Sequence, residues 1–493
     1  MTHQFSLRSS NLKILPRSLA FNVDVEYWLA RTEAGTRLVI LAPVESASSL
    51  AFDGQHSELA GKTIILCPLS PANANTLRSQ LTWLQPQTIG LKTSAGLGDR
   101  LGIATPGHVR AIRNTAGSIA PVFTQQSIRE MTRTCRTPQQ VMDDAIWGVF
   151  EEGWQSGFGA DADHLKTFAD IDACLPIGYT FFTIDPGDHV NNRAETAGLE
   201  VLRALAEKLP PDIQPRASGL QGKTFQMEGY TLTLDEHTLL KATVKYGGAV
   251  AHVLAMYQYL SKTAGSRPFE FEVSVDETDQ PTSHAEHIYI AHELKRLGVQ
   301  WVSLAPRYVG RFEKGVDYIG DVDAFEADIA GHAAIARSFG PYKLSLHSGS
   351  DKFSIYPAAM RQTRGLVHLK TAGTSYLEAL RTIASIDVDF FGEIYKFARE
   401  RFDQDKASYH ISAKTERAPL PNEVTDWLSL FDQFDAREIL HVTFGSVLTY
   451  KGTNGDRYFY DRIMQILQAS PEAYAINLEK HFGRHLEHFM RAK

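Results

Sequence analysis

The alternation of apolar and polar residues over 342–347 predicts a short β-strand that ends in a polar turn. Leu344 and Leu346 alternate with Ser345 and His347, so the two sets point to opposite faces of an extended chain. A Ser-Gly-Ser turn follows at 348–350 and precedes a helical pattern. A strand that meets ionisable side chains at a glycine turn before a helix is typical of one βα unit of an α/β enzyme.

The same succession of strand, polar turn and helix recurs from residue 87 onward. We predict strands over 87–92, 118–124, 179–184, 269–275, 299–304, 342–346, 366–369 and 439–444. Repeated strand–helix units of this kind predict an α/β protein with a (β/α)8 barrel of the TIM type, which needs about 250 residues. A doubly wound open sheet is the competing fold, and it would place ligands at a switch point instead.

The segments outside these repeats are expected to be additions to the barrel. The predicted organisation is a small α/β or β appendage over 1–85, a catalytic barrel over 86–450 with insertions near 191–238 and 387–435, and a helical C-terminal extension over 451–493. In that extension His481, His485 and His488 share one helix face. We interpret the extension as a solvated terminal helix in preference to a metal-binding face.

Composition and charge narrow the class of protein. The formal net charge of −7 and the pI of about 6.2, without a dense basic run, argue against binding to nucleic acid. Three widely spaced cysteines, Cys67, Cys135 and Cys174, suggest neither a disulfide framework nor a thiolate zinc site, and they fit a reducing cytoplasm. No secretory signal at the N-terminus and no long apolar segment is recognisable, so we expect a cytoplasmic protein without a membrane partner.

A glycine-rich segment over 93–102 raises the question of a nucleotide cofactor. Its glycines, Gly96, Gly98 and Gly102, do not have the spacing of the dinucleotide-binding fingerprint, and no acidic residue follows at the end of a second strand about 20 residues on. We therefore expect no NAD.

Ionisable side chains gather at the predicted carboxyl ends of the strands. They are His189, His347, His368 and His441, the carboxylates Asp185, Asp188, Glu272, Asp276 and Glu277, the cations Arg307, Lys352 and Lys370, and Gln125. The ends of barrel strands face one another across one mouth, so these side chains are expected to meet. Imidazoles and carboxylates suit a divalent cation such as Mn²⁺, Fe²⁺, Ni²⁺, Zn²⁺ or Mg²⁺.

Each of these residues also has an ordinary structural explanation. His368 and His441 could fill a layer of the barrel interior, and Glu272 could be a paired structural acid. Asp276 and Glu277 could be acids that a helix N-terminus favours. The lysines could form salt bridges, hold a substrate carboxylate or form a Schiff base. The glycine turns after the last two predicted strands offer N–H groups to an anion.

Five segments are together more specific than any generic motif. QQSIREM at 125–131, TIDPGDH at 183–189, SVDET at 274–278, LHSGSDK at 346–352 and HLKTAGT at 368–374 resemble the tagaturonate epimerase family. The resemblance covers roughly 85–450. It implies a metal-dependent enzyme of hexuronate catabolism that interconverts D-tagaturonate and D-fructuronate, two small-molecule keto-hexuronates.

Site roles follow from the resemblance residue by residue. It implies metal ligation by His189, His347 and His368, and proton transfer by Asp188 and Glu277. We expect Gln125, Arg307, Lys352 and Lys370 to bind the substrate. The expected mechanism removes a proton from the carbon next to the ketone and returns one on the opposite face. The alternatives are a Schiff-base aldolase, a glycoside hydrolase or a non-catalytic sugar-acid binding protein.

Overall fold

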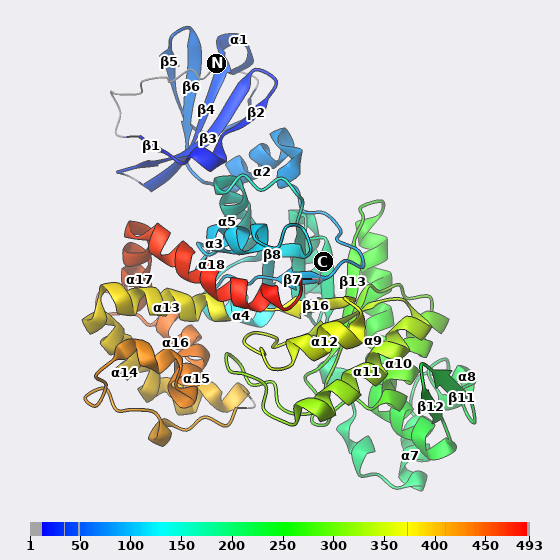
Figure 1. Cartoon of the computed structure of the whole chain (residues 1–493). Coiled ribbons are helices and arrows are strands. Elements are labelled where there is room, and N and C mark those ends of the chain that lie inside the picture. The colour runs from blue at the N-terminus through cyan, green and yellow to red at the C-terminus, as the bar shows by residue number, and fades with distance from the viewer. Residues whose placement is uncertain (1–11, 34, 48–49, 372, 410, 491–493) are drawn as a thin grey trace.

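A closed barrel of eight parallel strands forms the centre of the computed structural model, which describes residues 12–33, 35–47, 50–371, 373–409 and 411–490. The predicted α/β class and (β/α)8 fold are therefore confirmed (Figure 1). In order around the barrel the strands are β7 (Ser94–Gly96), β8 (Ala120–Ser127), β9 (Gly159–Leu165), β10 (Phe181–Ile184), β13 (Glu270–Val275), β14 (Ser303–Pro306), β15 (Lys343–Leu346) and β16 (Val367–Lys370). Pairing of β16 with β7 closes the barrel.

Two of the predicted strands are wrong, and two strands of the barrel, β7 and β9, were missed. The segment 439–444 spans the end of helix α15 (Phe434–Val442) and the start of α16 (Phe444–Thr449), because a short apolar run cannot be told from a buried helix by its pattern. The segment 87–92 lies just before β7 and forms no strand. β9 was missed because its alanines alternate with Asp161 and Asp163, and no β-branched or aromatic residue marks a strand there.

The two faces of the barrel strands carry different kinds of side chain. Ala160, Ala162, Leu344 and Leu346 belong to the hydrophobic core. The alternate residues point into the barrel, where charged side chains from several strands meet, as the contacts of Lys370 across the interior demonstrate. Bulky aliphatic residues usually fill this space. Here ion pairs fill it instead, so a search for apolar strands misses part of the barrel.

Helices follow most of the strands and cover the barrel. They are α3 (Thr105–Arg113), α4 (Ile128–Thr134), α5 (Pro138–Glu151), α6 (Phe168–Cys174), α9 (Glu236–Ala264), α10 (His284–Arg296), α11 (Val322–Phe339), α12 (Tyr356–Thr363) and α13 (Thr374–Ile386). Three of them begin with a capping box, formed by Thr137 with Gln140, by Thr167 with Asp170 and by Ser283 with Glu286. Along the described residues, no helix combines the length and apolarity that a membrane span requires.

The N-terminal part forms a separate antiparallel sheet. Its strands are β1 (Lys13–Ile14), β2 (Ala20–Asn22), β3 (Val25–Thr32), β4 (Gly35–Pro43), β5 (Gln55–Leu59) and β6 (Lys62–Cys67), with helices α1 (Val44–Ala47) and α2 (Pro71–Gln80). The strand order is β1-β3-β4-β6-β5, and β2 also pairs with β3. Figure 1 shows this sheet at one end of the molecule, beyond α2. Residues 1–11, where a secretory signal was sought, lie outside the described residues.

The insertions and the C-terminal extension are mostly helical. They contain α7 (Leu199–Ala206), α8 (Pro215–Ser218), the hairpin of β11 (Thr224–Met227) and β12 (Tyr230–Thr233), α14 (Val388–Asp405), α17 (Tyr458–Ala469) and α18 (Pro471–Glu487). The interpretation of α18 as a solvated helix is wrong. It packs against α3 and α13, and His481 and His485 are buried beside Asp351.

The pKa of Glu438 in α15 makes stability depend on pH. The side chain is fully buried, and burial with the nearby Glu313 carboxylate raises its pKa from 4.5 to about 8. The folded protein binds this proton more tightly than the unfolded chain does. The resulting stability is complete below about pH 4.5 and is lost as the pH rises through about 8. We expect Glu438→Gln, which mimics the protonated acid, to remove this dependence.

Urea unfolding of wild type and Glu438→Gln at about pH 5 and about pH 8 measures the effect. The variant should gain on the order of 3–4 kcal/mol relative to wild type between these conditions. The same pH dependence in both proteins would contradict the raised pKa.

Candidate functional site

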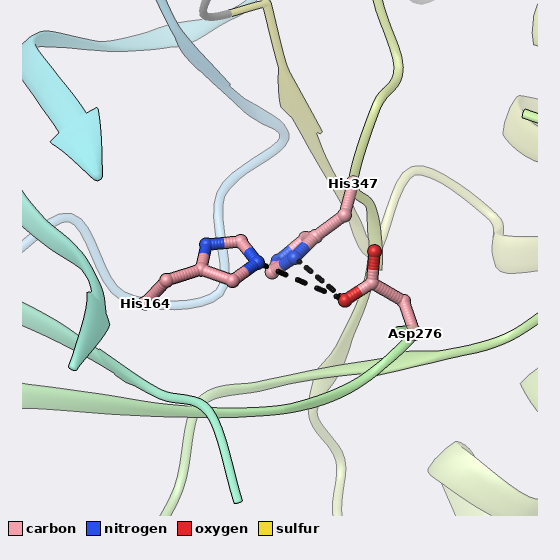
Figure 2. Close-up of side chains that lie close together, drawn as sticks. All are labelled: His164, Asp276 and His347. Atoms are coloured by element: carbon pink, nitrogen blue, oxygen red, sulfur yellow. Dashed lines mark ion pairs between the residues drawn. The ribbon is translucent and has the colours of Figure 1, made fainter. Parts of the chain in front are cut away.

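Three side chains from different strand ends meet at the mouth of the barrel (Figure 2). His164 lies near the end of β9, Asp276 follows β13 and His347 follows β15. Asp276 Oδ1 lies 3.3 Å from His347 Nδ1 and 3.9 Å from His164 Nε2. All three ligand atoms lie within 4.8 Å of one another. Two imidazole nitrogens and a carboxylate oxygen form a donor set suited to a divalent transition-metal cation.

Carboxylates hold the other ring nitrogen of each histidine. His164 Nδ1 lies 2.7 Å from Asp163 Oδ1, and His347 Nε2 lies 2.7 Å from Glu272 Oε1. Such contacts orient metal-binding imidazoles in known metal sites. Burial opposes a positive charge on His164, but Asp163 and the other nearby carboxylates outweigh it and raise the pKa to about 10. The carboxylates therefore attract positive charge to this point, whether a proton or a metal cation.

Lys370 neutralises the carboxylates beneath the histidines. Its Nζ lies 2.8 Å from Asp161 Oδ2, 2.7 Å from Asp163 Oδ1 and 2.8 Å from Glu272 Oε1. Burial opposes the ammonium charge, yet the three carboxylates raise the pKa of Lys370 well above its usual value. The lysine thus fixes the same two carboxylates that hold His164 and His347.

Two cavities meet at His347. The larger one, of about 570 Å³, is lined by residues that include Asp276, Glu277, Arg307 and Lys314. The smaller one, of about 40 Å³, reaches Asp163, His164 and Lys370. His347, Ser348 and Lys314 line both cavities. The histidine cluster therefore faces a space that can admit a small molecule.

Cationic side chains surround the larger cavity. Arg129 pairs with Glu277 at 2.8 Å, and Lys314 Nζ donates to Ser348 Oγ at 2.7 Å. Among the described residues, no carboxylate lies within ion-pair distance of Lys314 or Arg307. Their charges are therefore available to an acidic ligand.

The structure brings together several of the predicted residues and adds one. His347, Glu277, Arg307, Lys370 and Gln125 line the two cavities. Gln125 Nε2 donates to Asp163 Oδ2 at 2.8 Å. Sequence reasoning missed His164, because it lies near the end of β9, which was not recognised as a strand. The alternation of alanine with aspartate over 160–163 is the signal that could have revealed it.

Asp188 and His189 do not join this group. After β10 the chain turns at Asp185, whose carboxylate accepts from the N–H of Gly187, and enters the short 3₁₀ helix Gly187–His189. Asp188 is exposed and pairs with Lys166 at 2.9 Å. The exposed His189 ring stacks on His252 with centroids 4.1 Å apart. Neither side chain lines the two cavities.

The side chains of His368 and Lys352 also lie away from the two cavities, in the interior of the protein. His368 Nδ1 lies 2.9 Å from Ser94 Oγ inside the barrel, and burial lowers the pKa of His368 well below its usual value. Lys352 Nζ donates to the carbonyl oxygens of Glu313 at 2.7 Å and Ser350 at 3.1 Å. It therefore holds together two loops that border the site.

His441 reaches the smaller cavity from helix α15, and not from a strand. Gly315 and Gly373 leave room for its ring, since a Cβ atom at these positions would lie 2.7 Å and 2.2 Å from ring atoms. Its Nε2 lies 3.5 Å from Arg100. Burial, with nearby Arg100, lowers the pKa of His441 well below its usual value, so this imidazole is neutral.

A closed α/β barrel with imidazoles and carboxylates at the carboxyl ends of its strands defines an enzyme with its active site at the barrel mouth. The chain belongs to the tagaturonate epimerase family, since the UxaE family model matches residues 15–489. It is therefore a carbohydrate epimerase, and the resemblance seen in the sequence is confirmed. This membership sets aside the aldolase, glycoside hydrolase and binding-protein alternatives.

Known proteins resemble this chain over nearly its whole length. It is 42% identical over 466 residues to the tagaturonate/fructuronate epimerase of Thermotoga maritima, covering 94% of each chain. The native crystal structure of the fructuronate-tagaturonate epimerase UxaE from Cohnella laeviribosi matches with a TM-score of 0.92 and 36% identity, over 99% of this chain and 98% of the other. A glycerol complex of the same enzyme matches with a TM-score of 0.91 and 36% identity, over 98% of this chain and 97% of the other.

Proposed function

We propose that this enzyme interconverts D-tagaturonate and D-fructuronate with the help of a divalent metal cation. One observation carries the proposal: the cluster of His164, Asp276 and His347 opens onto a cavity that also exposes Lys314 and Arg307. A keto-hexuronate has ketone and hydroxyl oxygens for such a cluster and a carboxylate for such cations. The names of the related enzymes support the same pair of substrates.

His164, Asp276 and His347 would hold the cation. Their donor set fits Mn²⁺, Fe²⁺, Ni²⁺ or Zn²⁺ better than Mg²⁺, which prefers oxygen ligands. When bound, the cation supplies Lewis-acid polarisation of substrate oxygens. Of the three metal ligands expected from the sequence, this assignment retains His347. It replaces His189 and His368 with His164 and Asp276.

The position of the inverted carbon decides the mechanism. The two keto-hexuronates differ at the carbinol carbon β to the ketone, whereas a ketone acidifies hydrogen only on the adjacent carbon. Removal of a proton next to the ketone, the mechanism expected from the sequence, therefore leaves the inverted carbon untouched. The hydroxyl group on that carbon makes the substrate a β-hydroxy ketone, and such a compound can break and re-form its carbon–carbon bond by a reversible aldol reaction.

We therefore propose that the enzyme inverts this carbon in three steps: cleavage of the carbon–carbon bond, rotation of the aldehyde fragment, and re-addition of the two fragments. A base takes the hydroxyl proton of the inverted carbon, the bond to the neighbouring carbon breaks, and the electron pair remains with the ketone fragment as an enediolate. The resulting aldehyde turns its other face, the bond re-forms, and the proton returns. Positive charge near the enediolate oxygens stabilises this intermediate.

Glu277 is the best placed base in this scheme, in agreement with its expected role. It lines the larger cavity beside Asp276. Partial burial opposes its ionisation, but His164 and Arg129 outweigh this and hold the pKa of Glu277 below its usual value, so it is a carboxylate at neutral pH. Lys314 and Arg307 would bind the substrate carboxylate and keep the aldehyde fragment in the cavity between cleavage and re-addition.

Turnover of D-tagaturonate in deuterated water tests the function and the mechanism separately. We expect D-fructuronate to form without deuterium at the inverted carbon, since that carbon keeps its own hydrogen throughout. Deuterium at this carbon, detected by NMR, would overturn the cleavage route and favour direct proton removal. Absence of any epimer with metal-loaded enzyme would overturn the proposed function itself.

A further inference from the structure

A second group of metal-ligating side chains lies between α10 and α11, outside the barrel mouth. His284 is the first residue of α10, and Asp328 and His332 lie one turn apart in α11. Asp328 Oδ1 lies 3.4 Å from His284 Nε2 and 3.5 Å from His332 Nε2. These three atoms all lie within 4.8 Å of one another. The proposed epimerase mechanism uses none of them.

His332 has an unused nitrogen that faces this group. Its side chain is fully buried, and its Nε2 has no hydrogen-bond partner in the described part of the chain. Its Nδ1 lies 2.9 Å from His287 Nδ1, and His287 Nε2 lies 2.7 Å from the hydroxyl of Tyr342. This chain of contacts fixes the ring and leaves Nε2 directed at Asp328. A buried polar atom without a partner is costly, and a bound cation would satisfy it.

We propose that His284, Asp328 and His332 bind a divalent transition-metal cation of the Zn²⁺ type. Two imidazoles and one carboxylate are zinc ligands, and the partly exposed His284 leaves a further position open to water. His284 Nε2 now lies 3.0 Å from the carbonyl oxygen of Asp328, and zinc would replace the proton of that contact.

The site would join three parts of the barrel. Asp328 Oδ2 accepts from the N–H of Val309 at 3.1 Å, in the loop that follows β14. The ring of Tyr308 in the same loop lies 5.6 Å from the ring of His332 and lines the larger cavity. Zinc would therefore tie α10 and α11 to the wall of the epimerase cavity and stabilise this wall, without contacting the substrate.

Zinc content measured on the full-length protein tests the site. Protein stripped with a chelator is dialysed against Zn²⁺, and bound zinc is measured by mass spectrometry. We expect His284→Ala and Asp328→Asn to bind about one equivalent less than wild type, whether or not the barrel mouth also holds zinc. His292→Ala removes another partly exposed histidine from the same helix and should bind as much zinc as wild type.

Two further readouts separate this site from the barrel mouth. Zinc should raise the melting temperature of Asp276→Asn, in which the proposed catalytic cluster is broken, but should raise it less in Asp276→Asn with His284→Ala. An anomalous difference peak between His284 and His332 at the zinc edge would locate the ion. Equal zinc content in wild type, His284→Ala and Asp328→Asn, with each variant folded by circular dichroism, would overturn the proposal.

Discussion

Asp276→Asn is expected to lower kcat by about 10²–10⁴-fold while the protein stays folded, because it removes a proposed ligand of the cation whose charge would stabilise the reacting oxygens. Asp276 Oδ1 is the atom that His164 and His347 share. The amide removes its negative charge but keeps its size. Because Asp276 lies at the edge of a cavity, the amide can take the place of the carboxylate without a steric clash.

Steady-state kinetics with saturating metal measure this effect, and metal binding should weaken in parallel. Asp188→Asn is the informative comparison, since the sequence gives Asp188 a catalytic role while the structure places it in an exposed ion pair with Lys166. We expect Asp188→Asn to retain kcat close to that of wild type. Near-normal turnover by Asp276→Asn, or a severe loss in Asp188→Asn, would contradict the assignment of the site.

The barrel could be predicted from alternating strands, but not every strand of it. β15 could be predicted because leucines alternate with Ser345 and His347. β9 could not be predicted, because its inward side chains are Asp161 and Asp163. Burial of these two carboxylates is explained only by their ion pairs with Lys370, about 200 residues away in the sequence. Because β9 was not predicted, His164 was not recognised as a candidate site residue.

The direction of a side chain that follows the end of a strand could not be predicted from the sequence either. His189 and His347 both follow apolar strands and look alike in the sequence. The turn at Asp185 carries His189 to the outer surface, where it stacks on His252, whereas Glu272 holds His347 at the mouth. Local propensity does not specify such turns, because tertiary partners decide them.

Lys370→Met should cost about 3–5 kcal/mol of stability, the usual penalty for removing one partner of a buried ion pair. Lys370 is buried and contacts Asp161, Asp163 and Glu272, so its loss leaves negative charges uncompensated in the barrel. Activity should fall as well, because two of these carboxylates orient the site histidines. Urea unfolding with enzyme assays measures both effects.

Lys343→Met is the matched control, since Lys343 is a second buried lysine of the same barrel. Its Nζ donates to Ser94 Oγ at 3.0 Å, and burial lowers its pKa to about 8, so its charge is a cost to the fold. Whereas Lys370 is held charged by three carboxylates, Lys343 lacks an ion pair among the described residues. Lys343→Met should therefore destabilise far less than Lys370→Met or even stabilise the protein. Equal losses in the two variants would show that hydrocarbon packing, and not the charge of Lys370, supports the catalytic cluster.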